Sequence, residues 1–126
     1  MHTTDDAHRI DNNPDLLHVG IVDGKLWLSD DAQEDIRGFT GFLPDTDSPL
    51  RMLRFLQSEC RRLQAQDDPL GPEEAQRNFL AFCALKGLEH AIETKYLGPA
   101  HVGAFKPEGL IAAFFCPPLA ASLSLN

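Results

Sequence analysis

The sequence predicts an α+β domain in which an antiparallel sheet of about four strands packs against two to three helices. Three observations lead to this prediction: a turn signal between short apolar runs near the start of the chain, helical patterns through its middle, and a second turn signal near its end. The predicted order is therefore two strands, two or three helices and two further strands, with each pair of strands forming a hairpin.

The chain of 126 residues is long enough for a single domain with one hydrophobic core. Residues 1–14 are polar, lack hydrophobic periodicity and end in Asn13-Pro14, so we interpret them as a flexible N-terminal arm. Residues 15–126 are then the single globular domain.

The first hairpin is predicted from Asp23-Gly24, which lies between two apolar runs and favours the positive backbone angles of a two-residue type I′ turn. Trp27 then lies opposite Gly20, where its ring can cover bare backbone. The predicted register pairs Val19 with Leu28, Gly20 with Trp27 and Ile21 with Leu26. The core face of the hairpin carries Leu17, Val19, Ile21, Leu26 and Leu28.

Two helices are predicted after the hairpin. Ser29 or the aspartates that follow it can cap a short helix over residues 31–37, and Gly38 can end it. Ser48 caps a second helix that runs to about Gln66, with a proline in its first position. The spacing of 100° per residue predicts a core stripe of Leu50, Leu53, Leu56, Cys60 and Leu63.

A third helix is predicted over residues 72–97, with acidic residues in its first turn and Gly98-Pro99 after its end. Its segment from Phe79 to Leu85 is apolar on all sides. Two explanations fit this segment: the helix is central in the core, or Phe79 and Phe82 contact a second copy of the chain in a homodimer.

The end of the chain predicts a second hairpin around Lys106-Pro107-Glu108-Gly109, because proline suits the second position of a turn and glycine the last. An alternative stays open for the run from Leu110 to Cys116. This run is rich in alanine, a poor strand former, and could be a buried helical turn instead. The following Pro117-Pro118 ends either element.

Composition argues against two classes of partner. The formal net charge of −8 opposes binding to a nucleic-acid backbone. No apolar run approaches the ~20 residues that span a bilayer, and no leader segment is recognisable, so we expect no membrane partner and a cytoplasmic location.

The sequence offers little support for catalysis or for a cofactor. Three cysteines, far apart in apolar surroundings, predict reduced core thiols. Cys83 and His90 are seven residues apart on one helix, about 10 Å along its axis, which is too far for a thiol–imidazole pair. His90 with Glu89 and Glu93 is a weak metal pattern because the other helices offer no histidine, so we predict no metal. Short catalytic motifs are missing, which favours a protein that is not an enzyme.

A cationic stripe on the second helix is the strongest candidate for a binding surface. Four arginines fall within roughly 100° of arc on that helix, with an aromatic residue at the edge, and these residue types are enriched in interface hot spots. The competing explanation is that the arginines pair with the protein's own carboxylates. The predicted partner-binding residues are Arg51, Arg54, Phe55, Arg61 and Arg62.

Our leading hypothesis is therefore a small, acidic, non-catalytic module that binds another protein, of the inhibitor, immunity or regulatory type. The alternative hypothesis is a small-molecule-binding protein or minor enzyme with a pocket between sheet and helices. It follows from the aromatic residues and histidines on or near predicted strands, and its candidate pocket residues are His18, Trp27, His101 and Phe105.

Overall fold

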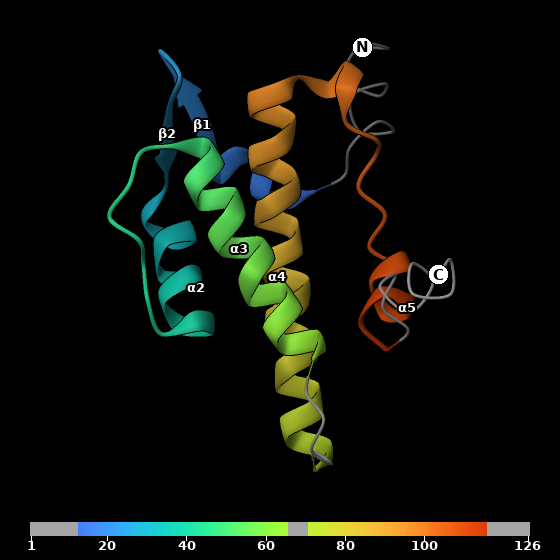
Figure 1. Ribbon diagram of the computed structural model, residues 1–126. Helices are drawn as coiled ribbons and strands as arrows, with labels where there is room; N and C mark the ends of the chain where they lie inside the picture. Colours follow the sequence, from blue (N-terminus) through green and yellow to red (C-terminus); the bar gives the residue numbers. More distant parts are fainter. Residues whose placement is uncertain (1–12, 66–70, 116–126) are drawn as a thin grey trace, which may run out of the picture.

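The structure is a computed structural model that describes residues 13–65 and 71–115. Within these ranges it contains one two-stranded sheet, four α-helices and two short 3₁₀ helices, labelled η (Figure 1). In chain order the elements are η1 (Pro14–His18), β1 (Val19–Val22), β2 (Lys25–Leu28), α2 (Asp30–Thr40), α3 (Pro49–Gln64), α4 (Pro72–Leu97), η2 (Pro99–His101) and α5 (Gly109–Phe115).

Helix α4 is the centre of the fold (Figure 1). It contacts α3 along much of its length and also touches η1, β1, α2, η2 and α5. Its segment Phe79 to Leu85 therefore lies between other elements, and Phe82 is 0% exposed. A central position in the core explains Ala81, Phe82 and Leu85, whereas Phe79 is half-buried and Leu80 is 52% exposed. Residues 1–12 of the predicted arm lie outside the described residues, whereas its last two residues, Asn13 and Pro14, belong to the fold.

The first hairpin has the predicted register. Asp23 and Gly24 adopt φ angles of 52° and 76°, as a type I′ turn requires. A Cβ on Gly20 would lie 3.4 Å from Cε3 of Trp27, so the indole ring does cover the bare backbone of the opposite strand. The prediction that Leu17 faces the core is wrong, because it lies in η1 and its side chain is exposed.

Helix α2 is longer than predicted. Ser29 caps it, accepting a hydrogen bond from the Ala32 N–H at 3.1 Å, but the helix passes through Gly38 and ends at Thr40. The left-handed residue that ends it is Gly41, with φ of 80°. A glycine inside a helix costs only about 1 kcal/mol, which the burial of Ile36 in the same helix outweighs.

Helix α3 begins as predicted, with Ser48 Oγ accepting a hydrogen bond from the Arg51 N–H at 3.3 Å. Its last residue is Gln64. Leu50 was predicted in the core stripe but is exposed, because the buried stripe is centred nearer to Met52. The buried residues of α3 are Pro49, Met52, Leu53, Leu56, Cys60 and Leu63.

The predicted fold class is wrong at the end of the chain. In the described residues there is no second hairpin and no four-stranded sheet: residues 102–108 form an irregular strap and α5 follows. The turn itself forms, with the Gly109 N–H donating to Lys106 O at 3.0 Å, but it opens a helix rather than a strand. For the run from Leu110 to Cys116, the helical alternative agrees with the structure better than a strand does. Cys116, Pro117 and Pro118 lie outside the described residues.

Two contacts explain this outcome. The Phe114 ring of α5 packs against Phe79 and Phe82, with centroids 5.5 and 5.2 Å away. The carbonyl of Gly103 in the strap bonds to the His90 ring at 2.8 Å, so it is used by a side chain rather than by a strand ladder. The strap and α5 are thus held by side chains of α4.

Candidate functional site

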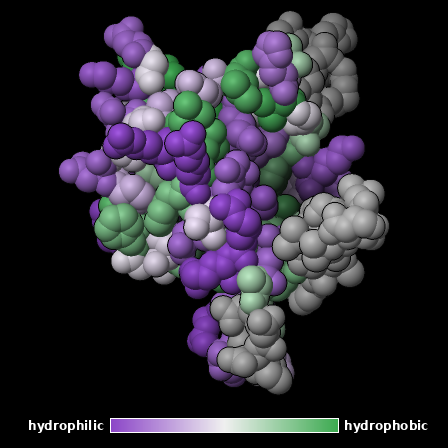
Figure 2. Space-filling model, viewed as in Figure 1, coloured by the Kyte–Doolittle hydropathy of each residue, from purple (hydrophilic) through white to green (hydrophobic). Residues whose placement is uncertain are grey.

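The outer face of α3 carries the four arginines that the helical spacing placed together. Figure 2 shows hydrophilic side chains running down the middle of the molecule over this helix. Arg51, Arg54, Arg61 and Arg62 are all exposed. Arg62 bonds to Glu59 Oε1 through Nε at 3.1 Å and Nη2 at 2.8 Å. The other three make no ion pair with any residue in the described ranges.

An aromatic pair borders these arginines. Phe55 of α3 is half-buried, and its ring lies 5.9 Å from that of Phe42, centroid to centroid. Phe42 follows α2 in the connection to α3 and is 59% exposed. Phe42 could not be predicted from the sequence, since its position beside Phe55 depends on the course of this loop. We call the four arginines with Phe42 and Phe55 the arginine face.

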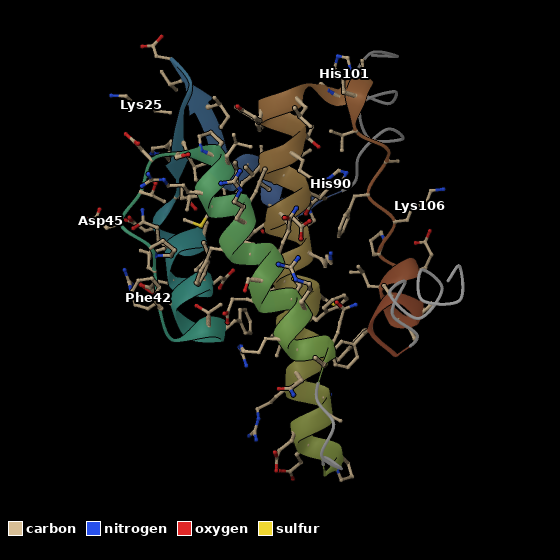
Figure 3. The ribbon with its side chains drawn as sticks, in the orientation of Figure 1. Lys25, Phe42, Asp45, His90, His101 and Lys106 are labelled. Carbon is tan, nitrogen blue, oxygen red and sulfur yellow. The ribbon has the colours of Figure 1, made fainter. Side chains whose placement is uncertain are left out.

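The four residues predicted to share a pocket lie in separate places. The His18 Nδ1 contacts Ser29 Oγ at 2.8 Å, beside an acidic pocket lined by Asp15, Asp31 and Asp35 among others. Trp27 lies in β2 and borders a different pocket, and Phe105 of the strap contacts the His90 ring. His101 is exposed in η2, at the end of α4 away from Lys106 of the strap (Figure 3). The structure does not bring these four residues together.

A cluster of charged side chains on α4, of which Glu89 is buried and Lys86 and Glu93 are partly exposed, lies beside the strap instead. Glu89 is only 8% exposed. Its Oε2 accepts a weak hydrogen bond from Gln57 Nε2 at 3.4 Å, and its Oε1 lies 3.4 Å from Lys86 Nζ without a hydrogen bond. Burial, and then the charge of Glu89, raises the pKa of Glu93, while His90 and Lys86 act to lower it. A small pocket of about 210 Å³ borders this cluster.

His90 of this cluster holds the strap against α4. His90 Nε2 bonds to Gly103 O at 2.8 Å, its Nδ1 lies 3.5 Å from Thr94 Oγ1, and its ring lies 5.2 Å from that of Phe105. Both ring nitrogens thus have partners within the fold. In the residues that the structure describes, no group of three or more side chains is arranged to hold a metal ion.

The two cysteines in the described ranges are free thiols, of which Cys60 is buried and Cys83 is partly exposed. Burial raises the pKa of the Cys60 thiol to about 12 and raises that of Cys83 as well. A thiol that stays protonated at neutral pH is a poor nucleophile and a poor metal ligand. Burial thus disfavours the thiolate form of both cysteines.

The two residues proposed for a dimer contact differ in access. Phe82 is fully covered by its own chain, so its ring has no surface to offer a second copy. Phe79 is half-buried against Phe114. A dimer contact near this part of α4 remains a prediction that concerns Phe79 only.

A pocket of about 670 Å³ lies between β2, the start of α2 and the loop 41–48. Trp27, which is 53% exposed, borders it. Asp30 and Asp45 give it an acidic rim, and neither residue was predicted to belong to a site. Its lining residues are Leu26, Trp27, Leu28, Ser29, Asp30, Gln33, Leu43, Pro44, Asp45, Thr46 and Met52.

Comparisons of the chain with protein-family models, with curated proteins and with solved structures give no match. Among the described helices, none combines the length and the apolar character needed to cross a bilayer.

Proposed function

We propose that the chain is a small non-catalytic module that binds another protein, of the inhibitor, immunity or regulatory type, and that the arginine face contacts an acidic surface of the partner. One observation carries this proposal: Arg51, Arg54 and Arg61 have no ion pair in the described ranges, although acidic residues outnumber basic ones by 19 to 11 in the chain. Among the described residues, the competing explanation, pairing with the protein's own carboxylates, accounts for Arg62 and for none of the other three arginines.

The chemistry of these groups suits a protein partner. A guanidinium group presents several donors in one plane and can bond a carboxylate through two of them at once. The neighbouring Phe42 and Phe55 add apolar contact area that can exclude water from such pairs. Arginines bordered by an aromatic pair combine residue types that are enriched in interface hot spots.

The test begins with a pull-down of the tagged protein from its native lysate at low and high salt, followed by purification of the retained protein. The affinity of that partner is then measured for the wild type and for Arg54→Glu. We expect the reversal to weaken binding by about tenfold or more, or roughly 1.4 kcal/mol. The free energy of unfolding should change by no more than about 0.5 kcal/mol, because Arg54 is exposed and unpaired.

Lys25→Glu is the matched control. Lys25 is also exposed, and it lies on the hairpin, away from α3 (Figure 3). This control changes the net charge by the same amount, so it separates a local contact from long-range attraction. Equal loss of affinity in the two variants would contradict a binding role for the arginine face.

A further inference from the structure

The outer edge of β2 is only partly covered. The Leu26 N–H donates to Asp47 O at 2.7 Å, and Leu28 O accepts from Gln33 Nε2 at 2.9 Å. Both bonds run away from β1, so the backbone groups of Leu26 and Leu28 face the open edge of the hairpin. This orientation agrees with the strand register, in which Leu26 faces Ile21 and Leu28 faces Val19. In a hairpin with a two-residue turn, the residues of these two pairs do not hydrogen-bond to each other, so their N–H and C=O groups point away from the partner strand.

Two backbone groups on this edge have no partner in the described part of the chain: the Leu26 carbonyl and the Leu28 N–H. The loop that passes the edge bonds to itself instead. The Thr46 N–H donates to Pro44 O at 3.0 Å, and the Ser48 N–H donates to Thr46 Oγ1 at 3.1 Å. After its single bond to Leu26, the loop therefore does not continue as a third strand.

The pocket of about 670 Å³ lies along this edge. It is lined by Leu26, Trp27 and Leu28, which are consecutive. Side chains of consecutive strand residues point to opposite faces of a sheet, so a pocket that touches all three follows the backbone edge rather than one face. Loop residues from Leu43 to Thr46 form the opposite wall.

We propose that this slot binds an extended, basic peptide segment of another protein, which adds to β2 as a strand. In a parallel ladder, one residue bonds to the residues on either side of the one it faces. A peptide residue opposite Trp27 can therefore donate to the Leu26 carbonyl and accept from the Leu28 N–H. This arrangement uses the two open groups and leaves the bonds made by Asp47 and Gln33 in place.

The side chains around the slot define the chemistry of the peptide. The carboxylates of Asp30 and Asp45 favour lysine or arginine, and Figure 3 shows Asp45 on the outer side of the loop. The half-exposed ring of Trp27 can also contact a cation. Leu28 and Leu43 provide an apolar wall, so the fitting segment combines apolar and basic residues in an extended backbone.

The test selects random peptides displayed on phage against the full chain. Synthetic copies of the selected peptides are then titrated while the fluorescence of Trp27, the only tryptophan, and the hydrogen exchange of backbone amides are recorded. We expect basic peptides that slow exchange at the Leu28 N–H by about tenfold or more when bound. Methylation of the peptide nitrogen opposite Trp27 should abolish binding, because it removes the donor to the Leu26 carbonyl.

Two protein variants locate the charge contact. Asp45→Lys should weaken peptide binding about tenfold, whereas Glu108→Lys, an equal charge reversal on the strap, should leave it nearly unchanged. Arg54→Glu should leave peptide binding unchanged as well. The experiments can therefore contradict the peptide site while supporting the arginine face, or contradict the arginine face while supporting the peptide site.

Three results would overturn this inference. Selection could yield no peptide whose binding depends on Asp45. Selected peptides could bind without slowing hydrogen exchange at the Leu28 N–H, or could still bind after methylation of their backbone. Either result would indicate a small-molecule pocket that contacts only side chains of the peptide. Sedimentation could reveal a dimer in which the Leu28 N–H is already protected, and a second copy of the chain would then occupy the edge.

Discussion

Helices α3 and α4 lie side by side but differ in their relation to solvent. Helix α3 buries one stripe and exposes the opposite face, whereas α4 is covered by α3, the hairpin, α2 and α5 in turn. Core packing therefore decides most residue types along the middle of α4. The arginines on the outer face of α3 are exposed and are not fixed by core packing, which is why the proposed function concerns that face.

The largest effect is expected from truncating the centre of α4. Phe82→Ala should lower the free energy of unfolding by about 3–5 kcal/mol, because the ring is fully buried and packs against Phe114. Leu80→Ala, on the same helix at a side chain that is 52% exposed, is the control and should cost about 1 kcal/mol or less. Urea unfolding followed by circular dichroism measures both. Similar losses in the two variants would mean that α4 is not the core helix.

A smaller effect is expected where η1 crosses α4. A Cβ on Gly87 would lie 2.5 Å from Asp15 Oδ2 and 3.3 Å from Asn13 Oδ1. The Asn13 side chain donates to the Gly87 carbonyl, which limits how far η1 can shift. Gly87→Ala should therefore destabilise the protein by about 1–3 kcal/mol, although alanine is the better helix former.

The same unfolding assay applied to Gly38→Ala provides the contrast. A Cβ on Gly38 has open space around it, and the residue lies inside α2, so this substitution should be neutral or stabilising. A stabilising effect at Gly87 as well would show that η1 does not pack closely against α4.

The smallest effect concerns pH. Because burial and the charge of Glu89 raise the pKa of Glu93 in the folded state, the ionised form of Glu93 opposes folding. The stabilisation due to this raised pKa is present below the unfolded value of 4.5 and is lost as pH rises through the folded value. Glu93→Gln should therefore be more stable than the wild type at pH 7 and equal to it near pH 4. Urea unfolding at both pH values checks this, and a constant difference would exclude ionisation of Glu93 as the cause.

Local chemistry explains what could be predicted. The type I′ turn at Asp23 and Gly24 needs two successive positive φ angles, which few residue pairs tolerate, so the hairpin and its register follow from the sequence. The start of α3 and both ends of α4 likewise depend on caps and prolines close by in the chain. The end of α2 was predicted too early because Gly38 and Gly41 offer similar local signals.

At the end of the chain, local sequence signals predict the turn but not the element that follows it. The turn from Lys106 to Gly109 was predicted and forms, but the same turn can precede either a strand or a helix. Contacts of Phe114 with Phe79 and Phe82, about thirty residues earlier, accompany the helical outcome. Such contacts have no signature in a short window of sequence.

The candidate sites also combine features that the sequence predicts with features that depend on the tertiary structure. The sequence by itself determined that four arginines share one face of α3, since residues on a regular helix follow each other at 100°. Only the tertiary structure decided that three of them have no ion pair in the described ranges, because this depends on the positions of carboxylates far away in the chain. The open edge of β2 is likewise a tertiary feature. Whether a strand edge is covered depends on the course of the loop that passes it, and periodicity and composition do not encode that course.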